Sequence, residues 1–204
     1  MKAARGRCHW LRPPGPVAPG LRIGLLGGSF NPAHEGHVHV SEVALKRLGL
    51  DYVWWLVTPQ NPLKGRVGLA PLADRLCHAR TIAHHPRIVV MDIERALGTQ
   101  YSIDTLKALQ RRFPLVEFTW LMGSDNLEIF RRWRRWQDIA ARVPIAVVQR
   151  PGTILAALSA KPMQHSQARR AIRVIDGKRN MQSSTALRAR ALESEALVGA
   201  IPPC

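Results

Sequence analysis

Short apolar runs alternate with amphipathic stretches along most of the chain. Predominantly apolar runs, as expected of buried strands, lie at residues 23–26, 52–58, 88–91, 116–122 and 145–149. Between them, apolar residues recur at helical spacing in residues 38–50, 72–84 and 102–112. Strands that alternate with helices predict an α/β fold, in which a Rossmann-like, doubly wound parallel sheet is covered by helices on both faces.

The two ends of the chain depart from this alternation. Residues 1–20 are basic, rich in proline and without acids, so we expect a disordered leader; a transit peptide is the alternative, which the proline density disfavours. Residues 21–200 are expected to form one domain, with a small C-terminal helical part from about residue 151. Within that part, residues 168–175 predict either a short helix or a helix followed by a strand.

Ligands of parallel sheets bind beyond the carboxyl ends of the strands. Polar or glycine-rich segments follow the first four predicted strands, at residues 27–37, 58–64, 92–102 and 123–126. The first of these segments leads into a helix, whose first backbone N–H groups and positive dipole end favour an anion. A phosphate site is therefore the first functional hypothesis.

The glycines and histidines of this first segment allow several interpretations. Gly27 and Gly28 by themselves predict a tight turn with positive φ, and their spacing fits neither the dinucleotide fingerprint nor the P-loop. His34, His37 and His39 lack further ligands at metal-binding spacing, and His39 is expected to be a surface or packed core residue. We expect His34 and His37 to donate hydrogen bonds to phosphate oxygens at the helix start.

A second helix start lies near the C-terminus. There Ser183, Ser184 and Thr185 are good N-cap residues, and Arg188 follows one turn later. One interpretation is an ordinary capped, solvent-facing basic helix. The other is the second half of a phosphate clamp, in which backbone, hydroxyl and guanidinium donors converge with those of the first segment.

Charge narrows the class of partner. The chain has 30 Lys and Arg against 14 Asp and Glu, a formal net charge of +16, which favours polyanions or phosphorylated small molecules. Residues 131–136 interleave arginines with Trp133 and Trp136, as in proteins that bind single-stranded nucleic acid. These tryptophans share one side of a predicted helix with Phe130, which favours a buried stripe below a solvated basic face. Nucleic acid is therefore not expected as the main ligand.

Hydropathy also bears on the expected location. No apolar run approaches the roughly 20 residues needed to cross a bilayer. The N-terminal segment lacks the apolar region of about 7–15 residues that a secretory signal requires. We expect a cytoplasmic protein without a membrane partner.

Several motifs resemble those of a known family. Residues 27–37 resemble the Gly-Gly-x-Phe-Asp-Pro-x-His-x-Gly-His signature of the nucleotidyltransferase superfamily of α/β phosphodiesterases, and residues 183–188 resemble its C-terminal Ser-Ser-Thr-x-Ile/Leu-Arg motif. Residues 61–64, 101–106 and 123–127, together with Trp133, are similar to the bacterial nicotinate-mononucleotide adenylyltransferases. The resemblance runs from about residue 21 to residue 197. Asn31 departs from the superfamily pattern, which more often has Asp there, so a role that needs a carboxylate at this position is not carried over.

The resemblance implies a reaction. The 5′-phosphate of nicotinate mononucleotide attacks the α-phosphorus of ATP and expels pyrophosphate, which gives nicotinate adenine dinucleotide, a step of NAD biosynthesis. Mg²⁺ is expected on the ATP phosphates, with no metal ligands from the protein, because no paired acids accompany the motifs. A sister transferase that acts on nicotinamide mononucleotide or phosphopantetheine, or that uses a cytidylyl donor, is the nearer alternative, and a basic nucleic-acid-binding protein is the more distant one.

The resemblance also implies roles for single residues. Catalytic roles fall on His34, His37 and Arg188. ATP contacts are expected from Gly27, Gly28, Ser29, Phe30, His34, His37, Asp125, Ser183, Ser184, Thr185 and Arg188. Contacts with nicotinate mononucleotide are expected from Asn31, Lys64, Ser102, Thr105 and Trp133. In this assignment Asp125 binds a ribose hydroxyl, for which a helix cap is the alternative, Trp133 stacks on the pyridine ring and Ser102 receives the nicotinate carboxylate.

Overall fold

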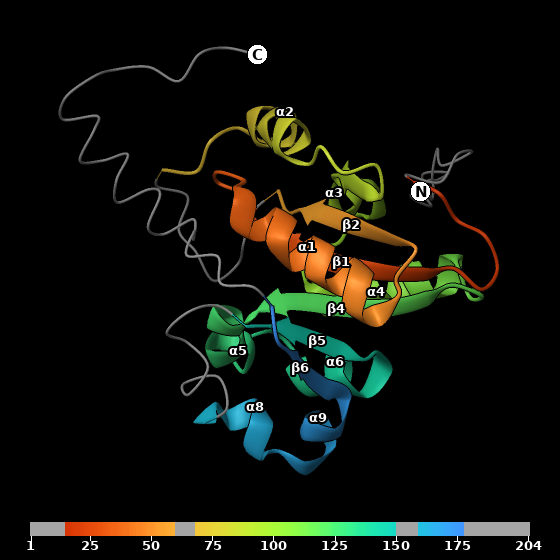
Figure 1. Cartoon of the computed structure of the whole chain (residues 1–204), viewed down its shortest axis with the longest axis vertical. Coiled ribbons are helices and arrows are strands. Elements are labelled where there is room, and N and C mark those ends of the chain that lie inside the picture. The colour runs from red at the N-terminus through yellow and green to blue at the C-terminus, as the bar shows by residue number, and fades with distance from the viewer. Residues whose placement is uncertain (1–14, 60–67, 150–158, 178–204) are drawn as a thin grey trace, which may run out of the picture.

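The computed structural model describes residues 15–59, 68–149 and 159–177. Its centre is one sheet of six strands in the order β3-β2-β1-β4-β5-β6, and each neighbouring pair is parallel. The strands are β1 (Arg22–Gly28), β2 (Tyr52–Val57), β3 (Ile88–Met91), β4 (Glu117–Gly123), β5 (Ile145–Val148) and β6 (Ile172–Ile175) (Figure 1). The predicted doubly wound parallel sheet is confirmed. Because the strand order reverses between β1 and β4, the crevice at their carboxyl ends is the place where such sheets bind ligands.

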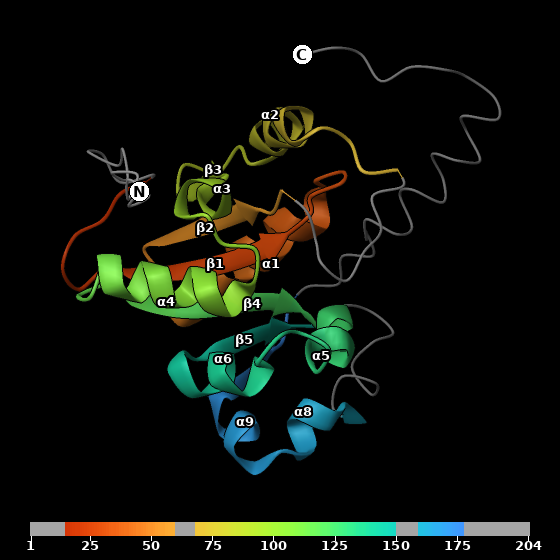
Figure 2. The same ribbon diagram turned by 180° about the vertical axis from the view of Figure 1, so that it is seen from behind.

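Helices cover both faces of the sheet. On the face nearer the viewer in Figure 1 lie α1 (Glu35–Leu48) and α2 (Leu72–Ile82). Figure 2 shows α4 (Ser102–Arg112) and α6 (Trp136–Arg142) in front of the opposite face. The remaining described helices are short: α3 (Ile93–Leu97), α5 (Ser124–Phe130), α8 (Lys161–Gln164) and α9 (Ser166–Ala171).

Burial on both faces explains why the strands are predominantly apolar at successive positions. In β2, Trp54 and Leu56 belong to the core below α4 and α6, whereas Val53, Trp55 and Val57 belong to the core below α1 and α2. Successive side chains of a strand point to opposite faces, so every position of a strand between two helical layers is buried. This is the physical reason that the strands were readable from the sequence.

The structure differs from the prediction around the tryptophans. A single helix was predicted to carry Phe130, Trp133 and Trp136, but α5 ends at Phe130 and α6 begins at Trp136. Between them Arg135 has a φ of 51°, which a continuing right-handed helix does not allow. The 3.6-residue spacing was therefore produced by two helices and a turn.

The two ends of the domain differ from the prediction as well. Residues 15–20, predicted as part of a disordered leader, lie against the domain: Val17 packs on the core and the Gly20 backbone N–H donates to the Leu115 carbonyl at 2.8 Å. The predicted C-terminal helical part is only partly helical where it is described, because α9 is followed by β6, which pairs with β5. Of the two alternatives for residues 168–175, a helix followed by a strand is confirmed.

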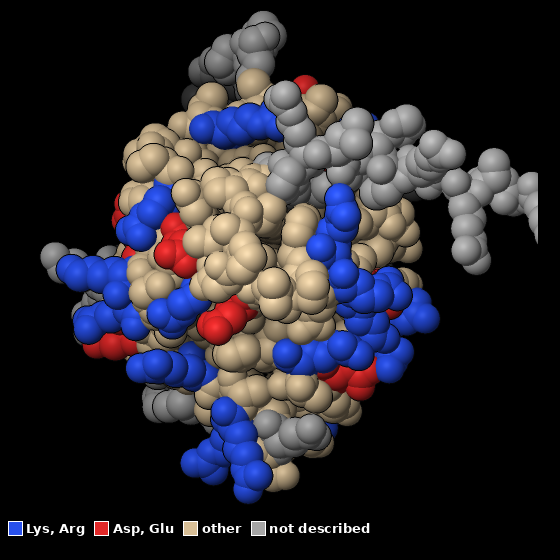
Figure 3. All heavy atoms as spheres, turned by 90° about the vertical axis from the view of Figure 1, so that its right-hand side faces the viewer, with Lys and Arg blue, Asp and Glu red and all other residues tan. Residues whose placement is uncertain are grey.

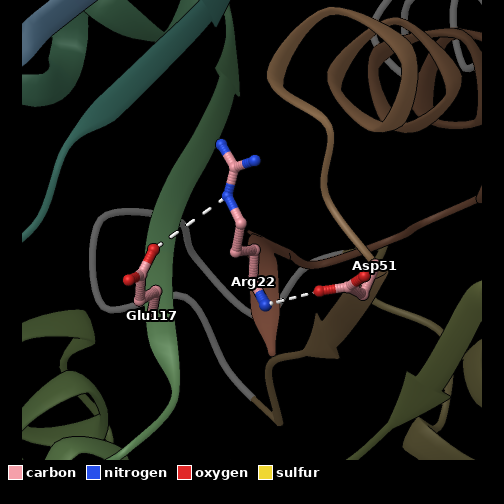
Figure 4. A network of polar contacts seen from close by, with 3 residues as sticks. All are labelled: Arg22, Asp51 and Glu117. Carbon is pink, nitrogen blue, oxygen red and sulfur yellow. Dashed lines mark hydrogen bonds and ion pairs between the residues drawn. The ribbon is translucent and has the colours of Figure 1, made fainter. Parts of the chain in front are cut away.

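The amino ends of the strands form a basic edge. There the Arg22 backbone N–H donates to the Asp51 carboxylate at 2.7 Å, and the Arg22 guanidinium lies 4.0 Å from the Glu117 carboxylate (Figure 4). Seen from this side, basic side chains occupy more of the surface than acidic ones (Figure 3). A cleft of about 480 Å³ opens here between Arg22, Arg142 and Arg173. It lies opposite the carboxyl ends, and no residue of the predicted site lines it.

Candidate active site

The loop after β1 turns at a residue other than the predicted glycines. Gly27 and Gly28 are the last two residues of β1, and neither has positive φ; the positive φ, 46°, belongs to Phe30. The tight-turn interpretation of the glycines is therefore wrong. Gly27 instead allows a close approach, because a Cβ there would lie 3.0 Å from the ring of Trp120, which would have to shift slightly.

Packing holds Phe30 in its unusual backbone conformation. A bulky residue with positive φ is an outlier that the surrounding structure must stabilise. The Phe30 ring is 1% exposed, stacks on Trp55 at 5.0 Å and lies 4.6 Å from the ring of His37, as measured between centroids. The turn and the histidine beside it are thus set by the same aromatic cluster.

His34 and His37 together cap the start of α1. The Gly36 backbone N–H donates to His34 Nδ1 at 3.0 Å, and the His34 backbone N–H donates to His37 Nδ1 at 3.2 Å. Since each Nδ1 accepts a hydrogen bond, each neutral imidazole carries its proton on Nε2. Both side chains are thereby donors at a helix N-terminus, which is the chemistry expected of a phosphate site.

A short chain of hydrogen bonds links this cap to β2. Trp55 Nε1–H donates to Ser41 Oγ, and the Ser41 hydroxyl donates to the His37 carbonyl, both at 2.8 Å. Ser41 and Trp55 are fully buried. The first turns of α1 are therefore tied to the strand next to β1, which fixes the backbone of His37 relative to β2.

Asn31 is used by the fold. Its Nδ2 donates to the Gly68 carbonyl at 2.8 Å, and its Oδ1 accepts from the Ala70 backbone N–H at 3.2 Å. An amide can both donate and accept, whereas the carboxylate of Asp can only accept. This explains how asparagine serves at a position where the superfamily more often has aspartate; a contact between Asn31 and the mononucleotide stays a prediction.

The end of β4 brings a second group of predicted residues to the crevice. Asp125 is half-buried in the first turn of α5, where its charge suits the helix dipole, but the N-cap is Gly123, so the helix-cap alternative does not hold for its side chain. Trp133 is half-buried in the turn before α6 and packs edge-on against Trp120 and Phe130, with ring centroids 5.8 and 5.4 Å apart. Trp133 therefore packs on the core and keeps part of its surface exposed, and stacking of a ligand on it stays a prediction.

Ser102 and Thr105, predicted to contact the mononucleotide, have different surroundings. Ser102 is half-buried at the first position of α4, beyond the end of β3. Thr105 is 0% exposed, and its hydroxyl lies 2.8 Å from Thr99 Oγ1 and donates to Glu94 Oε1 at 3.4 Å. The predicted ligand contact of Thr105 is therefore corrected: its hydroxyl is engaged inside the protein and supports the start of α4.

Glu94 was not predicted from the sequence. Its side chain is 5% exposed, and burial raises the pKa of its carboxyl above the usual 4.5, although hydrogen bonds with Thr58 and Thr105 act in the opposite direction. An acid with a raised pKa holds its proton more tightly in the folded chain than in the unfolded one. Its contribution to stability is present below pH 4.5 and is lost as pH rises through the raised pKa.

We expect the Glu94→Gln variant to keep its stability over the pH range in which the wild type loses the contribution of protonated Glu94. The unfolding midpoint of the wild type should fall relative to that of Glu94→Gln as pH rises from 4.5 to 8, because the neutral amide has no proton to lose. Thermal unfolding at several pH values measures the difference, with exposed Glu128→Gln as the matched control. A midpoint difference that stays constant with pH would contradict the role of burial.

Arg75 was missed as well. It is 3% exposed on α2, and burial lowers the pKa of its guanidinium. A charged residue four positions before Ala79, within the apolar stripe of the helix, was the signal in the sequence.

Five predicted site residues, Lys64, Ser183, Ser184, Thr185 and Arg188, lie outside the described residues, so their roles stay predictions.

The described part of the chain has neither a membrane-spanning helix nor a cluster of metal ligands. No helix in it is long and apolar enough to cross a membrane. No group of three His, Cys, Asp or Glu residues in it is arranged to hold a metal ion.

The doubly wound sheet, with helix-start donors at its switch point, defines the class as an α/β nucleotide-binding protein. The sequence profile of the cytidylyltransferase-like family matches residues 25–190. A probable nicotinate-nucleotide adenylyltransferase of Parvibaculum lavamentivorans is 59% identical over 69% of this chain and 70% of its own length, and one of Methylorubrum extorquens is 50% identical over 83% and 100%. The chain therefore belongs to the cytidylyltransferase-like family and, within it, to the nicotinate-nucleotide adenylyltransferases.

Solved structures agree on the fold. The structure of a Plasmodium falciparum nicotinic acid mononucleotide adenylyltransferase complexed with NaAD has a TM-score of 0.64, covers 83% of each chain and is 18% identical. A putative nicotinate-nucleotide adenylyltransferase from Vibrio parahaemolyticus has a TM-score of 0.57 at 17% identity, and covers 85% of this chain and 82% of its own. At these identities the likeness extends to the fold.

Proposed function

We propose that this chain transfers the adenylyl group of ATP to nicotinate mononucleotide and releases pyrophosphate, which yields nicotinate adenine dinucleotide for NAD biosynthesis. The observation that carries this function is the pair His34 and His37 at the start of α1, each with Nδ1 held by a backbone N–H. Relatives 50–59% identical carry the corresponding name, which supports the choice of substrate. The expected location of such an enzyme is the cytoplasm.

The chemistry suits a site built from hydrogen-bond donors. The second pKa of a phosphate monoester lies near 6, so the attacking 5′-phosphate is already ionised at neutral pH and needs no general base. What remains is in-line positioning and stabilisation of the charge on the transferred group. The Nε2–H groups of His34 and His37, at the positive dipole end of the 14-residue helix α1, supply that charge stabilisation.

The acceptor would lie beyond the neighbouring strands. In this arrangement the pyridine ring stacks on Trp133, and its carboxylate lies near Ser102 at the start of the 11-residue helix α4.

Mg²⁺ would be bound by the ATP phosphates. The donors at the start of α1 are imidazole and amide N–H groups, whereas Mg²⁺ prefers oxygen ligands.

A direct assay tests the function. The purified protein is incubated with Mg·ATP and, in turn, nicotinate mononucleotide, nicotinamide mononucleotide and phosphopantetheine, and dinucleotide and pyrophosphate are quantified. We expect the highest kcat/KM with nicotinate mononucleotide. A preference for either other acceptor would assign a sister activity. Tight nucleic-acid binding that ATP does not compete away, together with no pyrophosphate release, would refute the enzyme.

A further inference from the structure

Arg75 is a buried cation whose guanidinium group donates hydrogen bonds to four backbone carbonyls. Its Nε donates to the Ala70 carbonyl at 2.9 Å and its Nη1 donates to the carbonyls of Ser29 at 2.6 Å and Thr58 at 2.8 Å. Its Nη2 donates to the Pro59 carbonyl at 3.0 Å. Arg75 is 3% exposed, and all four of these acceptors are backbone carbonyls of the protein, so they define what its guanidinium does.

These four carbonyls come from separate parts of the site. Ser29 lies in the loop between β1 and the two histidines, Thr58 and Pro59 follow β2, and Ala70 lies just before α2. Pro59 and Ala70 stand on either side of the stretch that holds Lys64 in the sequence. One side chain therefore joins residues 29–34, the loop between β1 and α1 that is called the phosphate loop below, to two other segments. These segments lie on either side, in the sequence, of residues 61–64, the motif with the predicted acceptor contact Lys64.

Other contacts support the same junction. Asn31, in the loop after β1, binds the backbone of Gly68 and Ala70, as described above. His78, one turn after Arg75 on α2, has its Nε2 3.1 Å from the Ala33 carbonyl. The helix α2 thus holds the phosphate loop at two points, Ser29 and Ala33.

We propose that Arg75 is a positioning residue, which fixes the loop before the histidines against the segments that follow β2 and precede α2, and so aligns the ATP phosphates with the acceptor. This inference rests on the proposed function. An in-line displacement is sensitive to such alignment, because a misplacement of about 1 Å can cost roughly 10²-fold in rate.

The geometry requires arginine in particular. A guanidinium presents five N–H donors in a rigid plane and can bind carbonyls that lie in different directions. A lysine ammonium is a compact point charge with three donors on a flexible stem, so it can keep the charge without joining the same set of carbonyls. Substitution by lysine therefore keeps the positive charge and removes the planar set of N–H donors, so the two contributions can be measured separately.

The test compares Arg75→Lys and Arg75→Met with Arg80→Met, an exposed arginine of the same helix. For each protein, kcat, the KM of both substrates, the Kd of ATP without acceptor and the unfolding midpoint are measured. We expect Arg75→Met to lose about tenfold or more in kcat while the ATP Kd and the mononucleotide KM change less than about threefold. Arg75→Lys should lie between it and the wild type, and Arg80→Met should match the wild type.

The outcomes separate the two proposals. Wild-type kcat in folded Arg75→Lys and Arg75→Met, or a loss confined to substrate affinity, would overturn the positioning role. If Arg75→Met does not fold, Arg75→Lys measured below its unfolding midpoint decides. If the wild type forms no dinucleotide, the proposed function fails by itself. Amide exchange at residues 29–31, 33–34 and 58 then tests Arg75, and exchange as slow in the variants as in the wild type would overturn its positioning role.

Discussion

Replacing His37 by alanine is expected to lower kcat by about 10²–10³-fold and to change the KM for ATP far less. The His37 ring is held by the hydrogen bond that its Nδ1 accepts from the His34 backbone N–H and by its contact with the Phe30 ring. The backbone carbonyl of His37 accepts a hydrogen bond from Ser41. The Nε2–H group of His37 is therefore oriented before the substrate binds. Such a donor matters most when charge develops on the transferred group, because only interactions stronger in the transition state raise kcat.

Steady-state kinetics of His37→Ala with both substrates varied measures this effect. The substitution also removes a helix-cap acceptor, which is worth about 1 kcal/mol, so the unfolding midpoint is recorded to confirm that the variant is folded at the assay temperature. His84→Ala, on an exposed histidine beyond α2, is the control and should leave kcat unchanged. Unchanged turnover in His37→Ala would remove His37 from the catalytic residues.

Replacing Trp133 by alanine is expected to raise the KM for nicotinate mononucleotide by about 10–100-fold and to leave the KM for ATP nearly unchanged. Stacking of an aromatic base on a protein ring is worth roughly 1–3 kcal/mol by alanine substitution, and each 1.4 kcal/mol is tenfold in affinity. The half-buried Trp133 is positioned by its edge-on contacts with Trp120 and Phe130.

The neighbouring Trp136 provides a matched control. It is also half-buried and packs edge-on against Phe130 and His165, with ring centroids 5.7 and 5.4 Å apart, at the start of α6. Trp136→Ala should therefore lower the unfolding midpoint about as much as Trp133→Ala does, without a selective effect on the mononucleotide. If Trp133→Ala weakens ATP and mononucleotide equally, its role is packing.

Most helices and strands were predicted from the sequence, but one turn was not. The strands β1 to β5 and the helices α1, α2 and α4 were predicted within a few residues, and β3 and α4 at both ends, because burial on one or both sides leaves a periodic local pattern. The strand β6 was only one of two alternatives for residues 168–175. The turn between α5 and α6 was missed, since the spacing of Phe130, Trp133 and Trp136 imitates a continuous helix. The pattern of apolar positions contains no information about a local change of backbone φ, such as the positive φ at Arg135.

Candidate chemistry was predictable where it lies within one segment. His34 and His37 are three residues apart at a helix start, and their mutual cap follows from that spacing. Arg75 binds carbonyls up to 46 positions away in the chain, and Asn31 binds backbone groups 37 and 39 positions away. No spacing in the sequence indicates partners at such separations.

By itself, the sequence determined the doubly wound sheet, the edge of the sheet at which ligands are expected and the histidine pair at the start of α1. These features depend on local periodicity and on the rule that parallel strands present their carboxyl ends together. Only the tertiary structure decided that Phe30 makes the turn, that Thr105 faces Glu94 inside the protein and that Arg75 joins the two loops. Buried polar groups must find partners, and which partners they find is set by the packing of segments distant in sequence.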